Sequence, residues 1–234
     1  MTPSYLAVLG RIAPEKGVDR AIKIAIRCGI PLKIAAKVDR ADQEYYDEII
    51  RPLIDRHPLV EYIGEIGDHE KSDFLSGAIG LLVPIDWPEP FGLVMIEAMA
   101  CGTPVIAYNR GSVPEIIDEG LTGFIVEDET SAVAAIGRLS NLNRDAIRKQ
   151  FEARFTARRM ALDYLAAYRS LMEAAAPRIK LVSARNSDAR YLPDLLSMRA
   201  ERPRGAVQPT VVQVHGLGPF AITYANPADD PGRN

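Results

Sequence analysis

The sequence has little cysteine and little histidine, which limits the covalent and metal chemistry that it can support. Cys28 and Cys101 are the two cysteines among 234 residues, too few for a disulfide framework or a cysteine-based zinc site. The three histidines, His57, His69 and His215, lack the spacing of a metal site. We therefore expect no bound metal. Buried, reduced cysteines favour a cytoplasmic protein.

Long apolar runs and an excess of basic charge are also missing. No stretch of 18 or more apolar residues occurs, so the sequence predicts no transmembrane segment. The net charge is -3, whereas a general nucleic-acid binder usually presents a basic face, so we expect no nucleic-acid partner. A P-loop, a GxGxxG fingerprint and a serine nucleophile elbow are absent as well. What is left is ordinary globular composition, with 47% apolar and 25% charged residues.

Short apolar runs alternate with helical stretches through most of the chain. The apolar runs lack polar alternation, which is typical of strands covered on both faces, and they span 5–9, 32–36, 60–63, 79–83, 105–108 and 123–126. The helical stretches are 17–28, 41–56, 68–77, 92–101, 113–119, 129–140, 143–153 and 156–175. Repeated βα units predict a doubly wound parallel sheet of the Rossmann-like α/β class.

The composition changes near Pro177, where turn formers become frequent and no helical or strand period is sustained. We expect one α/β domain over residues 1–176 and an irregular or disordered tail over residues 177–234, in which 210–214 alone has strand character. The apolar stripe of the last two predicted helices has two interpretations: packing on this domain, or docking on another domain or chain.

Ligands of such sheets bind at the carboxyl ends of the strands, and the first loop at that edge is rich in glycine and charge. Gly10 and Gly17 allow close backbone approach, and Arg11 and Lys16 add two cations beside a helix start. This set suits a diphosphate. The alternative to phosphate binding is structural: a charged turn at the start of a helix, with no ligand.

The second loop, residues 86–92, presents Glu89 between Pro88 and Pro90, and a helix that contains Glu97 follows it. The prolines stiffen the loop, and carboxylates accept hydrogen bonds strongly from sugar hydroxyls. Glu97 is flanked by apolar residues and therefore needs a partner. The two carboxylates can bind different hydroxyls of one polyhydroxy ligand.

The third loop, residues 109–115, includes Ser112 and Glu115 at the spacing of a helix capping box, with Pro114 in the first turn. The capping box is a sufficient structural reason for Glu115, and a ligand contact is the alternative.

Together these loops resemble the C-terminal half of family 4 glycosyltransferases, which have the GT-B fold. The matching motifs, within about residues 5–171, are Gly10-Arg11 with Lys16-Gly17, Glu89-Pro90-Phe91-Gly92-Leu93 with Glu97-Ala98-Met99-Ala100-Cys101-Gly102-Thr103-Pro104-Val105, Gly111 with Pro114-Glu115, and Gly120 with Thr122-Gly123. Glu89 and Glu97 match the paired glutamates of the family. The resemblance implies the donor half of a retaining enzyme that transfers a sugar from a nucleotide-diphospho-sugar to an acceptor, without a metal or other cofactor.

By position, the resemblance implies that the catalytic residues are Glu89, Arg11 and Lys16. The two cations hold the diphosphate and neutralise the leaving group, and Glu89 binds hydroxyls of the donor sugar. Glu97 binds the ribose, and residues 64–67 lie near the base. The other implied donor-binding residues lie in the first loop and at the helix start, where amides assist anion binding: Gly10, Phe91, Gly92 and Leu93.

Family members also have an N-terminal Rossmann-like domain that holds the acceptor, and here the chain starts at the first strand of the donor half. We therefore expect a truncated glycosyltransferase. Its partners are the nucleotide-diphospho-sugar, an unidentified acceptor and a separate N-terminal GT-B half. The alternative is a non-catalytic nucleotide-sugar-binding subunit that needs a partner protein. A different GT-B enzyme, such as a nucleotide-sugar epimerase, is a third hypothesis that the paired glutamates disfavour.

Overall fold

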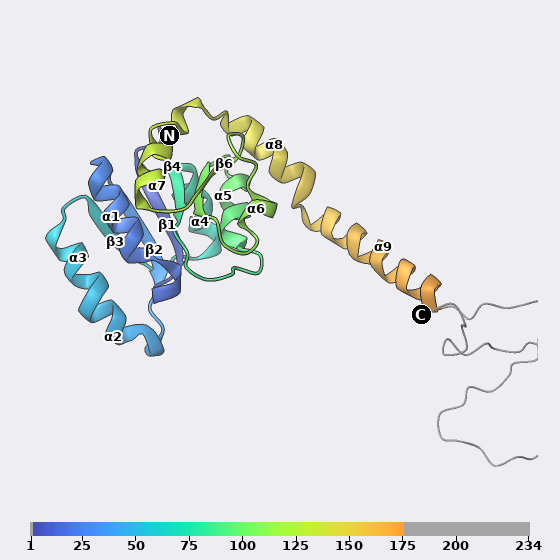
Figure 1. Ribbon diagram of the computed structural model, residues 1–234, viewed down its shortest axis with the longest axis horizontal. Helices are drawn as coiled ribbons and strands as arrows, with labels where there is room; N and C mark the ends of the chain where they lie inside the picture. Colours follow the sequence, from blue (N-terminus) through green and yellow to red (C-terminus); the bar gives the residue numbers. More distant parts are fainter. Residues whose placement is uncertain (1, 176–234) are drawn as a thin grey trace, which may run out of the picture. The chain divides into compact units, whose positions relative to one another are not determined.

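The computed structural model describes residues 2–175 and contains a six-stranded parallel sheet in the order β3-β2-β1-β4-β5-β6 (Figure 1). The strands are β1 Tyr5–Arg11, β2 Leu32–Lys37, β3 Val60–Gly64, β4 Ala78–Val83, β5 Val105–Tyr108 and β6 Gly123–Val126. Each strand lies where a continuous apolar run predicted it, so the doubly wound α/β class is confirmed.

Helices connect successive strands and follow the last one. They are α1 Val18–Cys28, α2 Gln43–Tyr45, α3 Arg51–Arg56, α4 Asp68–Ser76, α5 Leu93–Ala100, α6 Val113–Ile116, α7 Glu129–Ile136, α8 Arg144–Arg154 and α9 Ala157–Ala175. The stretch predicted over 41–56 is helical over residues 43–56, and a π-helical turn, Tyr46–Ile50, connects α2 to α3. Pro52 has no amide hydrogen for the carbonyl four residues earlier. The amide of Arg51 bonds to the carbonyl of Tyr46 instead, which widens the turn.

The predicted capping box at Ser112 and Glu115 is wrong. A capping residue usually has extended backbone angles, but Ser112 is already helical, with φ -74° and ψ -7°, and its side chain makes no capping bond. Helix α6 ends at Ile116, three residues before its predicted end. A capping box is found instead at α7, where the Asp128 carboxylate accepts a hydrogen bond from the amide of Ser131 at 2.7 Å.

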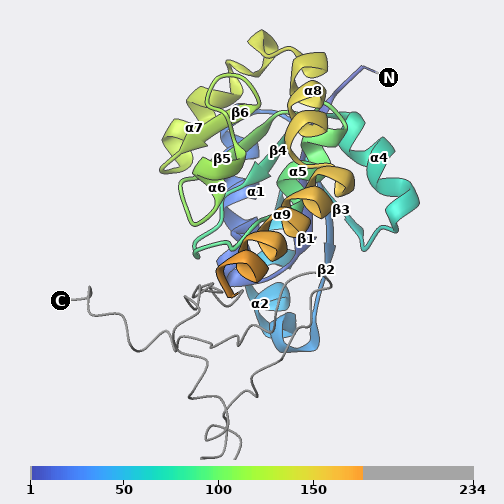
Figure 2. The same ribbon diagram turned by 90° about the vertical axis from the view of Figure 1, so that its right-hand side faces the viewer.

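Two apolar layers enclose the sheet. In Figure 2, α7 and α4 lie on opposite sides of the strands. The alternation of side chains along β1 explains both layers, because Leu6 and Val8 join one cluster while Ala7 joins the other. The first cluster takes residues from α1 and α7, and the second takes residues from α4, α5, α6 and α8.

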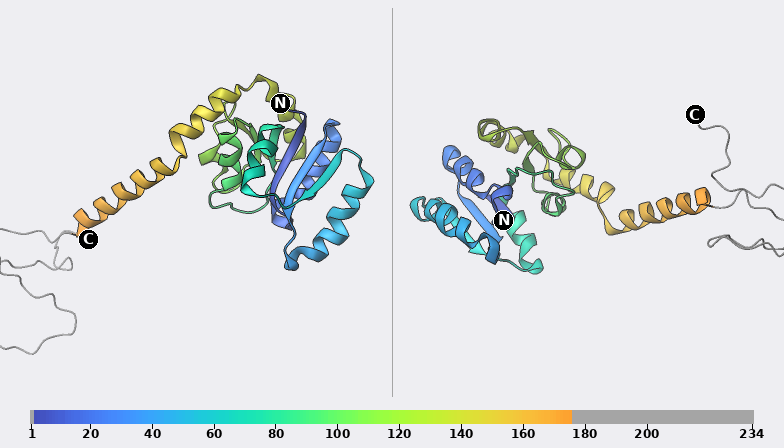
Figure 3. Two further views of the ribbon diagram at one scale, coloured as in Figure 1. Left: turned by 180° about the vertical axis from the view of Figure 1, so that it is seen from behind. Right: turned by 60° about the horizontal axis from the view of Figure 1, so that its bottom comes forward.

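The strand order reverses at β1, which pairs with β2 on one side and with β4 on the other. The segments coloured blue to cyan in Figure 3 lie in one half of the sheet, and the green segments lie in the other. In an open α/β sheet, the crevice outside the carboxyl ends of the strands at such a reversal is the usual ligand site. Here that crevice lies between the loops that follow β1 and β4.

The chain divides after Leu162, so the first unit contains the sheet and α1 to α8, and α9 crosses the division. Phe151 of α8 and Phe155, which follows that helix, pack against the second apolar cluster. Several apolar side chains of α9 are exposed: Met160, Leu162, Tyr164, Leu165, Tyr168, Leu171 and Met172. Docking on another domain or chain remains a prediction for this helix.

The predicted tail, residues 177–234 with its strand-like run, lies outside the described residues. No helix between residues 2 and 175 is long and apolar enough to cross a membrane.

We predict that Leu81→Ala lowers the free energy of unfolding by about 2–5 kcal/mol, because the substitution leaves a cavity in the central strand β4. Leu81 is 0% exposed. Urea denaturation followed by circular dichroism measures the change. Leu162→Ala is the matched control, because its side chain is 51% exposed and such changes usually cost about 0.5 kcal/mol or less. Equal losses in the two variants would contradict this core.

Candidate functional site

Hydrogen bonds connect the segment after β1 with the loop after β4 at the carboxyl edge of the sheet. The amide of Asp86 donates to the carbonyl of Glu15 at 2.8 Å, and Arg20 Nε donates to the carbonyl of Pro84 at 2.8 Å. Gly17, with φ +69°, begins α1, and any Cβ there would overlap the Pro84 carbonyl oxygen. Glycine is therefore required at this position for the two loops to meet.

The Glu89 carboxylate connects these two loops through side chains. Its Oε2 lies 2.7 Å from Lys16 Nζ and accepts a hydrogen bond from Trp87 Nε1 at 3.0 Å. The Lys16 ammonium also lies 4.7 Å from the centroid of the Trp87 ring, within cation–π range. The side chains of Lys16 and Glu89 are 29% and 15% exposed, so this pair is better shielded from water than a typical surface ion pair. Lys16, predicted to bind phosphate, and Glu89, predicted to bind sugar, are thus ion-paired to each other.

The loop after β5 supports Glu89 from the other side. The amide of Ser112 donates to the Glu89 carbonyl at 2.9 Å. Gly111 has φ +55°, and a Cβ there would overlap the backbone nitrogen and oxygen of Glu89. The Ser112 hydroxyl is buried without a hydrogen-bond partner among residues 2–175, and Glu115, the weaker ligand candidate, is exposed on α6. This loop therefore acts on the site through the backbone of Glu89.

Arg11, the second predicted phosphate cation, has acidic partners of its own. Its guanidinium nitrogens lie 2.7 Å from Glu15, 3.5 Å from Asp39 and 3.8 Å from Asp42. The hydrogen bond to Glu15 is the main reason that the pKa of Arg11 is raised. Both predicted phosphate cations are therefore paired with carboxylates, and an anionic ligand has to compete with these carboxylates for them.

The start of α5 offers unused backbone donors next to Glu89. Gly92 has φ +75°, and a Cβ there would lie 3.2 Å from Glu89 Cγ. The amides of Phe91, Gly92 and Leu93 donate to no residue within the described part of the chain. The side chains of Phe91 and Leu93 are exposed. A helix start with free amides is a favourable place for an anion.

Glu97, one turn into α5, has the partner that its apolar surroundings require. Lys71 Nζ of α4 lies 3.0 Å from Glu97 Oε1 and 3.0 Å from Asp68 Oδ1. Hydrogen bonds to Asp68 and Glu97 raise the pKa of Lys71. The sequence predicted that Glu97 needs a partner but did not identify Lys71, because the two residues come from different helices and share no local spacing.

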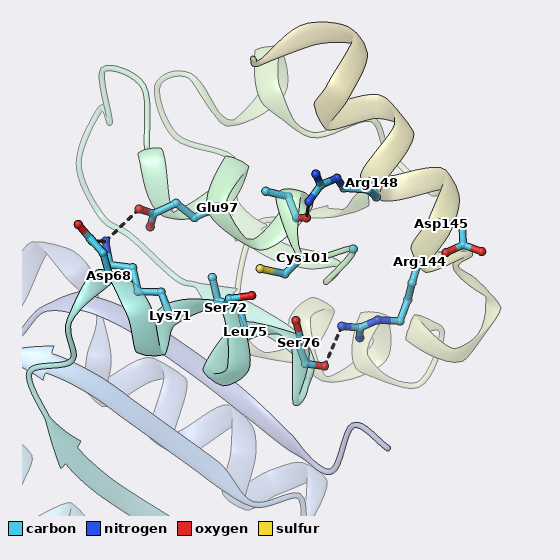
Figure 4. A pocket seen from close by; sticks show the side chains of 12 residues that line it. Asp68, Lys71, Ser72, Leu75, Ser76, Glu97, Cys101, Arg144, Asp145 and Arg148 are labelled. Carbon is cyan, nitrogen blue, oxygen red and sulfur yellow. Dashed lines mark hydrogen bonds and ion pairs between the residues drawn. The ribbon is translucent and has the colours of Figure 1, made fainter. Parts of the chain in front are cut away.

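Two cavities meet at this pair. The smaller, about 400 Å³, extends from Gly10 along the end of β2 to the loop after β3, and it includes three residues predicted to lie near a base: Glu65, Ile66 and Gly67. The larger, about 980 Å³, continues between α4, α5 and α8 (Figure 4). Lys71 and Glu97 line both cavities, and Glu89 lines neither. The structure thus brings Gly10 and Glu97 to one cavity and leaves Glu89 with Lys16 outside it.

The described residues include no group of three or more His, Cys, Asp and Glu side chains placed to hold a metal ion. The expectation that the protein needs no metal or cofactor stays a prediction.

Comparisons with known sequences place this chain in a family. The model of the family described as Glycosyl transferases group 1 matches residues 1–157. The alpha-maltose-1-phosphate synthase of Mycolicibacterium smegmatis is 30% identical over 135 residues, which are 56% of this chain and 35% of the synthase. The phosphatidyl-myo-inositol mannosyltransferase of Mycobacterium leprae is 28% identical over 116 residues, which are 50% of this chain and 30% of that protein. The chain thus spans about a third of each of these relatives.

Solved structures share the fold. AviGT4, a glycosyltransferase involved in avilamycin A biosynthesis, has a TM-score of 0.61 and 27% identity, over 74% of this chain and 52% of that one. Anabaena Alr3699/HepE, solved in complex with UDP and glucose, also has a TM-score of 0.61, over 72% of this chain and 49% of that one, but at 21% identity it supports the fold alone. With the family model matched over residues 1–157 and the GT-B type of fold confirmed, this protein belongs to the glycosyl transferases group 1 family.

Proposed function

We propose that the chain binds a nucleotide-diphospho-sugar as the donor-binding domain of a retaining glycosyltransferase. The observation that carries the proposal is the Lys16–Glu89 ion pair next to the free amides of α5. It places a cation, a carboxylate and anion-binding amides at one point of the crevice, as a sugar diphosphate requires. Membership of a sugar-transferring family supports the same conclusion.

The nucleoside of the donor occupies the smaller cavity in this proposal. Glu97 accepts hydrogen bonds from the ribose, and residues 65–67 face the base. Gly10 lines the same cavity. In this proposal the diphosphate passes out of the cavity beside Gly10 and extends toward Lys16 and the start of α5. A glycine at this point lets the phosphate approach the backbone closely.

The chemistry follows from charge that develops on the leaving diphosphate. When the bond between the anomeric carbon and the phosphate oxygen breaks, that oxygen gains negative charge, which Lys16, Arg11 and the α5 amides stabilise. Lys16 leaves Glu89 to do so, and the freed carboxylate accepts hydrogen bonds from the sugar hydroxyls. The acceptor hydroxyl passes its proton to the leaving diphosphate oxygen as its own oxygen bonds to the anomeric carbon, on the face that the diphosphate leaves.

The acceptor needs a second binding region, which we assign to a further GT-B half, since transfer requires both reactants in one geometry. The chain spans 35% and 30% of the two relatives described above and 52% of AviGT4, so truncation is part of the proposal. The proposal extends to a cytoplasmic setting, which fits the free Cys28 and Cys101.

We predict that replacing both Arg11 and Lys16 by alanine weakens the binding of nucleoside diphosphates by at least about tenfold, because charge-assisted hydrogen bonds to the phosphates are lost. Isothermal titration calorimetry with UDP, GDP and ADP measures the dissociation constants. Lys23→Ala with Arg27→Ala is the matched control, because it removes two ion-paired cations from α1 outside the three loops. Wild-type affinity in the Arg11 and Lys16 double variant would contradict the phosphate assignment.

We also predict that Gly111→Ala weakens the binding of nucleotide-diphospho-sugars and leaves nucleoside monophosphate binding unchanged. The new Cβ displaces the backbone of Glu89, which we assign to the sugar, whereas the nucleoside cavity is not lined by this loop. Gly120→Ala is the matched control: its φ is +74°, but a Cβ there meets nothing within 4 Å. Calorimetry with both ligands measures the effect, and equal behaviour of the two alanine variants would refute it.

A further inference from the structure

Lys71 is the cation at the border of the two cavities, and nothing in the sequence pattern assigned it a role. It projects from α4 toward α5, and Figure 4 shows its side chain and that of Glu97 directed toward each other. Asp68, from the same turn of α4, holds the ammonium from the other side at 3.0 Å. Lys71 thus has a fixed position between two carboxylates.

The surroundings of Glu97 make this contact consequential. Its helix neighbours Met95, Ala98 and Met99 are buried, so few other groups can orient the carboxylate. The side chains of Lys71 and Glu97 are 30% and 34% exposed, whereas that of Asp68 is 97% exposed. The Lys71–Glu97 contact is therefore the better shielded of the two from water, where charges interact more weakly.

The two oxygens of Glu97 are not equivalent. Oε1 accepts the hydrogen bond from Lys71, and Oε2 has no hydrogen-bond partner within the described residues. Fixing Oε1 sets the rotation of the carboxylate and leaves Oε2 available to the smaller cavity, which Glu97 lines. A ribose offers two adjacent hydroxyl donors to such an oxygen.

We propose that Lys71 is a positioning residue of the donor site, which holds Glu97 in the orientation that binds the ribose hydroxyls. The inference rests on the proposed function, since it takes the smaller cavity as the nucleoside site. Lys71 acts through Glu97 and does not contact the reacting atoms. Its second effect is to balance the charge of Glu97, which would otherwise repel the diphosphate.

The orienting effect and the charge effect differ in their dependence on the ribose hydroxyls. Loss of charge alone weakens a nucleoside diphosphate and its 2′,3′-dideoxy analogue equally, because both carry the same phosphates. Loss of orientation weakens only the ligand that has the hydroxyls. The ratio of the two dissociation constants therefore isolates the positioning role.

The experiment is calorimetric titration with the tightest-binding of UDP, GDP and ADP and with its 2′,3′-dideoxy analogue. We expect the wild-type chain to bind the ribose form about tenfold more tightly, as hydrogen bonds to a carboxylate imply. In Lys71→Met the ratio falls to about two, and in Lys71→Arg it is restored. Lys149→Met, which removes an exposed lysine from α8, keeps the wild-type ratio.

A ratio of about ten that persists in Lys71→Met overturns this inference and leaves the proposed function standing. A wild-type ratio of one overturns the inference together with the ribose role of Glu97. A chain that binds none of the three diphosphates overturns the proposed function itself. Asp68→Asn is a second variant, and because the Asp68 side chain is 97% exposed, the substitution leaves the packing of α4 undisturbed. It removes one ion-pair partner of Lys71 and keeps Lys71 itself. A ratio of dissociation constants between two and ten in Asp68→Asn supports the inference. A wild-type ratio in both Lys71→Met and Asp68→Asn opposes it.

Discussion

The geometry of the candidate site depends on Glu89, which is held from three directions. Lys16 and Trp87 bind its carboxylate, Ser112 binds its carbonyl, and Gly111 packs on its backbone. These contacts come from the loops after β1, β4 and β5, so one residue joins loops that the sheet alone would leave independent. The sheet in turn fixes the loop ends, because all of its strands run parallel and end at the same edge.

Each glutamate of the pair that the sequence singled out is matched with a lysine from another element. Lys16 holds Glu89, and Lys71 holds Glu97. Removing one partner of a buried ion pair is strongly destabilising, and these pairs lie between that case and a fully exposed pair, which contributes little. A diphosphate carries several negative charges, so it can replace Glu89 as the partner of Lys16 while the carboxylate turns to sugar hydroxyls. In the proposed function, the same residues thus stabilise the ligand-free site and bind the ligand.

Much of the fold could be predicted because it depends on local patterns. Continuous apolar runs place all six strands, and the loop motifs predict a site at the carboxyl edge of the sheet, where hydrogen bonds connect the loops after β1, β4 and β5. Local backbone details were not predicted: a π-helical turn precedes Pro52 inside the predicted helical stretch 41–56, and the helical backbone of Ser112 prevents a capping bond. The contacts of Glu97 with Lys71 and of Glu89 with Lys16 depend on packing between distant segments, which no spacing rule reports.

The most direct test of this account uses Trp87, the single tryptophan of the chain. Its ring touches Lys16, and its indole nitrogen donates to Glu89, so its fluorescence reports whether that pair is intact. We predict that titration with a nucleoside diphosphate changes the Trp87 emission as Lys16 moves to the phosphates, while the corresponding nucleoside leaves the emission unchanged. Calorimetrically confirmed binding of the diphosphate with no change in Trp87 emission would contradict the account.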